Sequence, residues 1–187
     1  MGEAAKHTWI SVADYLEGEK RAEVRHEYVN GEVFAMVGTT KAHNTIALNM
    51  ALLLRNQLAG KPCRVYMENV KVHIKTAISK QDFEERFYYP DLHVECRPFT
   101  DNRYYSERPK LIIEVLSHST ESDDRSDKLY AYLRLASLEE YVLVAQDEQR
   151  VEVYRRSEGW NPTVYGPEDS VRLESVGADL AVTAIYA

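Results

Sequence analysis

The spacing of hydrophobic and polar positions predicts many short strands, two substantial helices and one short N-terminal helix. The second of the substantial helices is predicted over 120–136. A long helix is expected to begin at Thr39 or Thr40 and to end before Gly60. A shorter helix is expected within residues 8–22, where Ser11 can act as its N-cap. The long helix is indicated by apolar residues that recur at helical spacing, namely Ile46, Met50, Leu53, Leu54 and Leu58.

Strand signals occupy most of the remaining chain. Asn30-Gly31 between two apolar runs is the strongest hairpin signal. Residues 64–67 and 70–74 have the pattern of strands, whereas the polar residues 76–86 are typical of a loop. Toward the C-terminus we expect strands over 140–145 and 150–156, and a small antiparallel pair formed by 163–165 and 171–173.

One acidic residue lies inside a strongly apolar run. Residues 110–116 are predicted to form a buried central strand, yet Glu114 stands within it. A buried carboxylate is costly unless a cation meets it. The alternative is a half-buried strand with Glu114 on its polar face, but Ile112 would then share that face. The pattern therefore favours a functional role for Glu114.

A second acidic residue follows a proline. Asp91 comes directly after Pro90 within a strand predicted over 87–95. Proline in a strand marks an edge, a start or a bulge, where a side chain can be aimed at a ligand. The alternative is an ordinary strand start. Because carboxylates on neighbouring strands can share one hard cation, Asp91 and Glu114 together suggest a metal site.

A second long helix, predicted over 120–136, follows the Glu114 strand. It carries Asp124 and Lys128 four residues apart, for which a surface ion pair is the alternative interpretation. Because this helix begins soon after Glu114, Lys128 is expected near the carboxyl end of that strand. Two other polar residues could complete a metal shell or hold a water, although a capping or structural role is the alternative for the histidine: Glu27 and His43.

Strands with two helices between them predict an α/β (α+β) fold, with a single mixed sheet flanked by helices. The chain has 187 residues and neither a repeat nor a linker, so residues 1–187 are expected to form one domain.

Composition adds limits on the function. The net charge of −7 argues against a large nonspecific nucleic-acid surface but leaves room for a local basic groove. Cys63 and Cys96 have no metal-binding spacing, which predicts two reduced, buried thiols in a cytoplasmic protein. The longest apolar run, residues 46–54, is too short to span a bilayer, and no secretory signal is visible, so no membrane association is expected.

Several short motifs follow one another in a particular order. They are Tyr28-Val29-Asn30-Gly31-Glu32, His43, Pro90-Asp91, Glu114-Val115-Leu116-Ser117, Asp124, Lys128-Leu129 and Tyr132. In this order the chain resembles the Uma-two family, restriction-endonuclease-like proteins of the PD-(D/E)XK nuclease superfamily, from about Tyr15 to Ile185. The resemblance implies a restriction-endonuclease-like core, a mixed central β-sheet flanked by α-helices, with extra antiparallel β-hairpins.

The superfamily pattern places an Asp after Pro and then an acid-x-Lys motif on the next strand. Asp91 and Glu114 match the two acids, but Leu116 occupies the position of the lysine. The resemblance implies that Lys128, from the following helix, takes the place of that lysine. It also implies that Glu27 matches the acid that precedes the hairpin in relatives.

The resemblance implies a metal-dependent endonuclease that hydrolyses phosphodiester bonds of nucleic acid, with DNA rather than RNA as substrate. Asp91, Glu114 and the backbone carbonyl of Val115 would hold Mg²⁺ or Mn²⁺, and Glu27 could join that shell. Lys128 would orient the attacking water or stabilise charge on the phosphate. Candidate contacts to the phosphate backbone are Lys41, Lys71, Lys75, Arg103, Arg125 and Arg134.

Two other interpretations stay open. The chain could be a catalytically silent module of the same fold that binds DNA or a protein partner. It could also be a metal-free structural domain in which Glu114 and Lys128 form a buried ion pair. A homodimer is a further expectation, because Val142 and Tyr154 on the strands near 141–155 need burial.

Overall fold

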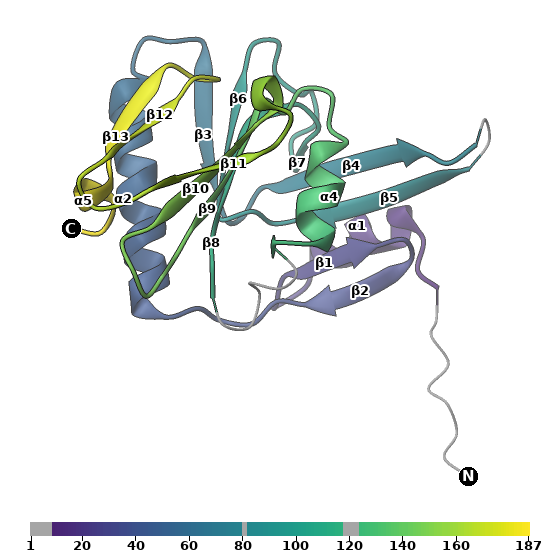
Figure 1. Ribbon diagram of the computed structural model, residues 1–187. Helices are drawn as coiled ribbons and strands as arrows, with labels where there is room; N and C mark the ends of the chain where they lie inside the picture. Colours follow the sequence, from purple (N-terminus) through teal and green to yellow (C-terminus); the bar gives the residue numbers. More distant parts are fainter. Residues whose placement is uncertain (1–8, 80–81, 118–123) are drawn as a thin grey trace. The chain divides into compact units, whose positions relative to one another are not determined.

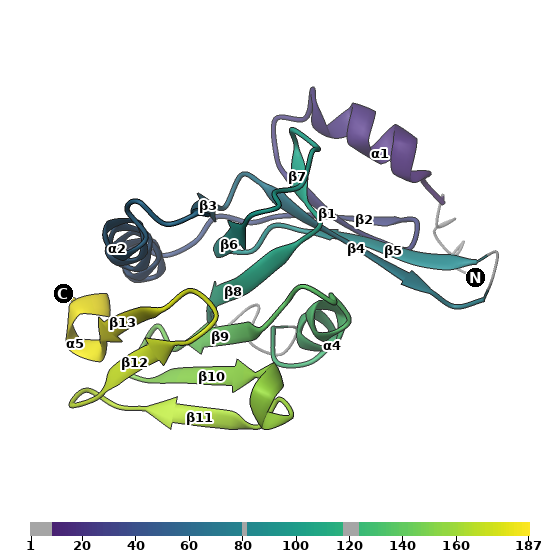
Figure 2. The ribbon, with the colours of Figure 1, turned by 90° about the horizontal axis from the view of Figure 1, so that it is seen from above.

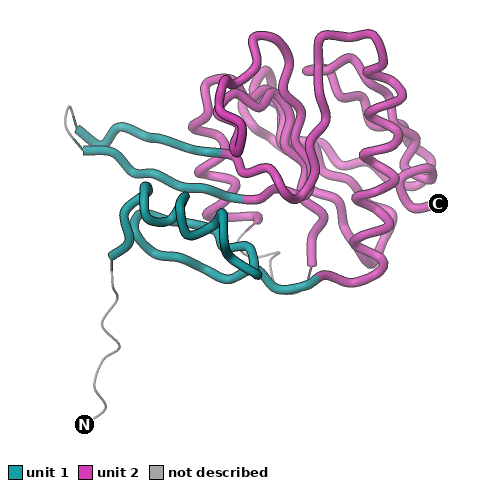
Figure 3. Tube along the Cα trace, turned by 180° about the vertical axis from the view of Figure 1, so that it is seen from behind, with its two compact units in different colours: residues 1–38, 73–88 teal, residues 39–72, 89–187 magenta. Residues whose placement is uncertain are grey.

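The computed structural model describes residues 9–79, 82–117 and 124–187, and the chain within it divides into two compact units (Figure 3). Unit 1 comprises residues 1–38 and 73–88, and unit 2 comprises residues 39–72 and 89–187. The expectation that residues 1–187 form one domain stays a prediction.

Unit 1 consists of one helix, an antiparallel hairpin of two strands, and two further strands (Figure 1). Ser11 caps the helix by accepting a hydrogen bond from the backbone N–H of Asp14, as the sequence predicts. Asn30 and Gly31 both have positive φ and form the predicted hairpin turn. The elements are α1 (Val12–Glu19), β1 (His26–Val29), β2 (Glu32–Ala35), most of β4 (Lys71–Ala77), and β5 (Phe83–Tyr88).

The core of unit 1 is aromatic. The ring of Tyr15 lies 5.0 Å from that of Tyr28 and 5.4 Å from that of Phe87, so helix α1 packs on strands β1 and β5 through these three rings. The loop predicted over residues 76–86 is wrong in its second half, where β5 forms. Residues Glu84, Glu85 and Arg86 of β5 are polar and only partly buried, which hides the strand signal.

Unit 2 is built on a six-stranded mixed sheet with the order β11-β10-β9-β8-β6-β3. Strands β8 and β9 are parallel and the other neighbours are antiparallel, which confirms the predicted mixed α/β class. The strands are β3 (Cys63–Met67), β6 (Leu92–Cys96), β8 (Pro109–Val115), β9 (Glu140–Val144), β10 (Val151–Arg155) and β11 (Pro162–Tyr165). The short strand β7 (Tyr105–Ser106) pairs with the first two residues of β4.

Helices cover the two faces of this sheet (Figure 2). On one face, α2 packs Ile46, Met50 and Leu54 against alternate strand residues such as Ile113 and Val142. The hairpin of β12 and β13 and helix α5 complete that core, while α4 lies on the opposite face. These elements are α2 (Lys41–Gln57), α4 (Asp127–Leu133), η1 (Arg156–Glu158), β12 (Ser170–Leu173), β13 (Ala178–Ala181) and α5 (Val182–Ile185).

Three further strand and helix assignments differ from the predictions. The strand predicted over 87–95 is two strands, because the chain breaks at Pro90. The predicted pairing of 163–165 with 171–173 is wrong, since β11 pairs with β10 and β12 with β13. Helix α4 is shorter than the predicted 120–136, and residues 118–123 lie outside the described part.

The prediction of two free thiols is wrong, because Cys63 and Cys96 form a disulfide. They are directly opposite each other on the paired strands β3 and β6. A pairing of residues 33 positions apart cannot be seen from cysteine spacing alone. The cytoplasmic location stays a prediction.

Burial of Val142 does not need a second copy of the chain. Its side chain is buried in the core of unit 2, and the hydroxyl of Tyr154 donates to Glu152 within the same sheet. The homodimer stays a prediction without this argument. Among the helices of the described ranges, none combines the length and apolar character that a bilayer crossing requires.

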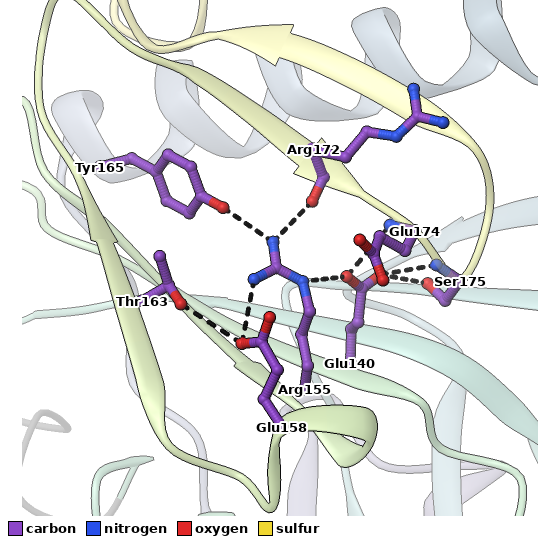
Figure 4. Close-up of polar contacts among 8 residues, drawn as sticks. All are labelled: Glu140, Arg155, Glu158, Thr163, Tyr165, Arg172, Glu174 and Ser175. Carbon is purple, nitrogen blue, oxygen red and sulfur yellow. Dashed lines mark hydrogen bonds and ion pairs between the residues drawn. The ribbon is translucent and has the colours of Figure 1, made fainter.

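A buried ion-pair network fastens the C-terminal strands to the sheet (Figure 4). Arg155 donates to Glu140, to the hydroxyl of Tyr165 and to the backbone carbonyl of Arg172. Glu140 also accepts hydrogen bonds from the backbone N–H groups of Glu174 and Ser175. The partners of Arg155 and Glu140 come from β9, β10, β11, β12 and the turn that follows β12, so this network links these segments.

We expect Arg155→Ala to lower the free energy of unfolding by about 3–5 kcal/mol, because it leaves the buried carboxylate of Glu140 without its cation. Urea titration checks this value. The matched control is Arg172→Ala, whose exposed ion pair with Asp179 should contribute less than about 1 kcal/mol. Equal losses in the two variants would show that the Arg155 network is not a stabilising element.

Candidate metal and nuclease site

Asp91 and Glu114 lie side by side at the junction of β6 and β8. The register pairs Leu92 with Ile113, which brings the preceding Asp91 next to Glu114. The backbone N–H of Asp91 donates to Oε2 of Glu114 at 3.0 Å, and the N–H of Val115 donates to Oδ2 of Asp91 at 2.7 Å. Each acid is thus held by the backbone of the other strand.

The interruption of the strand at Pro90 allows the N–H of Asp91 to bond Glu114. Proline has no N–H for a strand ladder, so the strand ends there, and Asp91 lies in a bend just before β6. The N–H of Asp91 therefore points to a side chain, that of Glu114, instead of joining a strand ladder. The irregularity predicted for Pro90-Asp91 is present.

Helix α4 presents two residues to Glu114. Lys128 Nζ lies 3.9 Å from Oε1 of Glu114 and 3.5 Å from Oδ1 of Asp124. One turn further along the helix, the hydroxyl of Tyr132 donates to the same Oε1 of Glu114 at 3.1 Å. The side chains of Lys128 and Asp124 are only 13% and 3% exposed, so the surface-pair interpretation does not hold.

His43 belongs to the same cluster. Thr40 caps α2 and places His43 in the first turn, where its Nε2 lies 3.1 Å from Oδ2 of Asp91. Burial lowers the pKa of His43, but the hydrogen bond and charge of Asp91 and the charge of Glu68 outweigh it, so the pKa is raised overall. The neighbouring Asp91 therefore stabilises the protonated form of His43.

The cluster has more acidic than basic side chains. It contains three carboxyl groups, those of Asp91, Glu114 and Asp124, against two basic groups, those of Lys128 and His43. Burial raises the pKa of Glu114 well above its ordinary value; Lys128 opposes this shift, whereas Asp124 and Asp91 add to it. A divalent cation would relieve this imbalance.

The donor set fits a hard cation in part. Carboxylate and carbonyl oxygens are the ligands that Mg²⁺ and Mn²⁺ prefer, and these ions usually keep several waters. Over residues 9–79, 82–117 and 124–187, no three His, Cys, Asp or Glu side chains have the arrangement of a metal site. Water and substrate oxygens would therefore supply the remaining ligands.

Glu27 belongs to unit 1, whereas the residues of the cluster belong to unit 2. Glu27 lies on β1 of unit 1, opposite Phe34 of β2. Its membership of the cluster stays a prediction. Of the other predicted residues, Asp91, Glu114, Val115, Lys128, His43 and Asp124 are brought together within unit 2.

Two tyrosines of this cluster had no predicted role. Tyr132 is fully buried and contacts Glu114; its signal was its spacing of four residues from Lys128. Tyr141 donates to the backbone carbonyl of Asp124, and burial raises its pKa well above the ordinary value. Its position within a buried strand gave no sequence signal.

The candidate phosphate contacts differ in their surroundings. Lys71 is buried and donates to the hydroxyl of Tyr89, which makes it a poor contact for a phosphate. Arg125 forms a bidentate pair with Glu152. Lys41 and Arg103 have exposed side chains in unit 2.

A solved structure is similar to this chain. It is a crystal structure from Anabaena variabilis, titled as that of "a putative nuclease belonging to DUF820", with a TM-score of 0.74 and 18% sequence identity. The match covers 95% of this chain and 97% of that one. At this identity the likeness shows the fold.

Sequence comparison gives closer relatives. Two proteins of Synechocystis sp., both named as uncharacterized, are 31% and 30% identical to this chain over 180 and 150 residues. The first match covers 95% of this chain and 91% of the relative, and the second covers 79% and 81%. The profile of the Uma2 family, described as "Putative restriction endonuclease", matches residues 12–184. This protein therefore belongs to the Uma2 family of restriction-endonuclease-like proteins.

Proposed function

We propose that this protein is a divalent-metal-dependent endonuclease that hydrolyses phosphodiester bonds of nucleic acid, with DNA as its substrate. The observation that carries the proposal is the pair formed by the partly buried Asp91 and the buried Glu114 beside Lys128, in a cluster with more acidic than basic side chains. The family supports a nuclease, and the choice of DNA rests on the wider superfamily.

The residues have separate roles in this proposal. Asp91, Glu114 and the carbonyl of Val115 would hold Mg²⁺ or Mn²⁺. When bound, such an ion lowers the pKa of a coordinated water and neutralises charge on the scissile phosphate. Lys128 would donate to the attacking water or to a phosphate oxygen, because its ammonium lies at the edge of the Glu114 carboxylate.

Other groups hold the acids in place. The hydroxyl of Tyr132 and the N–H of Asp91 each donate to one oxygen of Glu114 and so fix its rotamer. His43 and the N–H of Val115 do the same for Asp91. Pre-oriented ligands bind a metal without first losing rotamer freedom.

The charge distribution weighs against the metal-free structural interpretation. A distance of 3.9 Å between Lys128 and Glu114 is at the limit of an ion pair, and Lys128 is shared with Asp124. A single lysine between two buried acids does not neutralise both. A structural pair of the kind formed by Arg155 and Glu140 would be closer and fully hydrogen-bonded.

The silent binding module keeps one specific observation in its favour. Lys128 is engaged by two carboxylates, so in this state its ammonium is not directed to a substrate alone. In such a module the acids would still bind a metal, or DNA or a partner protein would be held without cleavage.

We expect Asp91→Asn and Glu114→Gln to abolish cleavage of DNA in Mg²⁺ or Mn²⁺, and Lys128→Met to slow it by about 10²–10³-fold. The measurement is nicking of supercoiled, linear, single-stranded and branched DNA. Each variant has an exposed counterpart that should stay active: Asp179→Asn, Glu139→Gln and Lys110→Met. Metal binding without cleavage of any substrate would favour the silent module, and full activity of the Asp91 and Glu114 variants would reject the site.

We expect Tyr132→Phe to weaken Mn²⁺ binding by about 10–100-fold, because Glu114 loses the donor that orients it. Isothermal titration calorimetry measures the affinity. Tyr141→Phe is the control, since it removes a buried hydroxyl from the neighbouring ring, 5.6 Å away, without touching a carboxylate. An equal affinity in the two tyrosine variants would remove Tyr132 from the site.

The affinity for Mn²⁺ should also rise with pH, because burial raises the pKa of Glu114 and the carboxyl must lose its proton to bind the ion.

A further inference from the structure

A cavity of about 320 Å³ lies in unit 2, beyond the carboxyl ends of the parallel strands β8 and β9. Leu116 and Ala145 contribute apolar surface to it, and Arg125 and Arg150 contribute guanidinium groups. Cavities of this size are at the lower end of those that hold small molecules. In open α/β sheets, ligands bind outside the carboxyl ends of parallel strands.

The strand register places this cavity beside the acidic cluster. Glu114, Leu143 and Glu152 are direct neighbours across β8, β9 and β10. Since side chains alternate along a strand, the residues two positions further on share their face of the sheet. The ladder continues to that row through Leu116 N–H to Val144 and Ala145 N–H to Arg150.

The next row on that face therefore consists of Leu116, Ala145 and Arg150, which all line the cavity. Two residues of a strand span roughly 6.6 Å. The distance along the strand from Glu114 to the cavity is therefore similar to the length of one nucleotide unit of a nucleic-acid strand. The chain also connects the two places at Arg125, which directly follows Asp124 of the acidic cluster.

A buried glutamate holds the two arginines at the cavity wall. Arg125 bonds both oxygens of Glu152 at 2.8 and 3.0 Å, and Arg150 lies 3.0 Å from one of them. Burial raises the pKa of Glu152, but hydrogen bonds and charges, chiefly of Arg125, outweigh it and keep the pKa low. A guanidinium carries five N–H donors, so Arg150 keeps donor capacity beyond Glu152 and its long 3.6 Å pair with Glu148.

The lining suits a nucleotide better than a bare anion. The carboxylates of Asp147 and Glu148 also line the cavity, so that with Glu152 three carboxylates face the two guanidinium groups, which disfavours a bare anion. A base presents both hydrogen-bond donors and acceptors and an apolar face, and a phosphate pairs with guanidinium groups. The amide of Gln146, whose oxygen accepts from Thr40, adds a further polar group.

We propose that this cavity holds one nucleotide of the strand that is cut at the neighbouring carboxylates, with Arg150 as a direct hydrogen-bond donor to it. The identity of the ligand rests on the proposed function. Glu152 acts as a positioning residue, because it orients both guanidinium groups.

The test is titration of the four deoxynucleoside 5′-monophosphates into the metal-free protein at low salt, followed by calorimetry. We expect a nucleotide to bind saturably, and Arg150→Gln to weaken its affinity at least tenfold. Inorganic phosphate should bind more weakly than the nucleotide. Arg172→Gln is the matched control, because this exposed arginine lies away from the cavity lining and should leave binding unchanged. Ala145→Leu reduces the cavity without removing a charge and should weaken binding as well.

The readout separates this inference from the proposed function. Asp91→Asn should lose cleavage and keep nucleotide binding. Cleavage by the wild type without nucleotide binding, or equal binding by wild type and both cavity variants, would overturn the nucleotide site alone. Equal affinity for inorganic phosphate would also overturn it, in favour of a simple anion site. Nucleotide binding lost in both cavity variants would support it even if no DNA is cleaved.

Discussion

The burial of one carboxylate, that of Glu114 on the central strand β8, constrains the rest of this site. Removing a charge from water costs several kcal/mol, and donors must offset that cost. The donors come from separate elements: the N–H of Asp91 from the start of β6, and Tyr132 and Lys128 from α4. The position of α4 over this face of the sheet is therefore coupled to the charge it covers.

The proline before β6 is the local counterpart of this constraint. A continuous strand over 87–95 would commit the N–H of residue 91 to a neighbouring strand. Pro90 ends the first strand, and the bend that follows turns the N–H of Asp91 to Glu114. The same break directs the carboxylate of Asp91 to the N–H of Val115 and to His43. Pro90, which interrupts the strand, thus allows Asp91 to make its contacts with Glu114, Val115 and His43.

Local signals predicted the parts of this fold that local physics decides. The caps at Ser11 and Thr40 and the Asn30-Gly31 turn were correct, because each depends on contacts within a few residues. Glu114 stood out because its neighbours are all apolar.

Signals that depend on distant partners were missed or misread. Residues 83–86 of strand β5 were taken for a loop, since Glu84, Glu85 and Arg86 are polar and partly buried. The disulfide of Cys63 and Cys96 and the pairing of β11 with β10 need the register of strands far apart in the sequence. Tyr132 could be placed near Lys128, but its contact with Glu114 depends on how α4 docks on the sheet.

Three of the buried glutamates of this sheet differ in the cations and donors that meet them. Glu140 is met by Arg155 and by backbone N–H groups, and Glu152 by two guanidinium groups that keep its pKa low. Glu114 lies in the same row as Glu152, with only Leu143 between them. Among the described residues, the cation that lies beside Glu114 is Lys128, at 3.9 Å and shared with Asp124, and burial raises the pKa of Glu114. Arginine meets two of these glutamates and neutral donors meet Glu95 of β6, whereas the cation beside Glu114 is a shared lysine at 3.9 Å. This contrast is what favours the proposed cation site at Glu114.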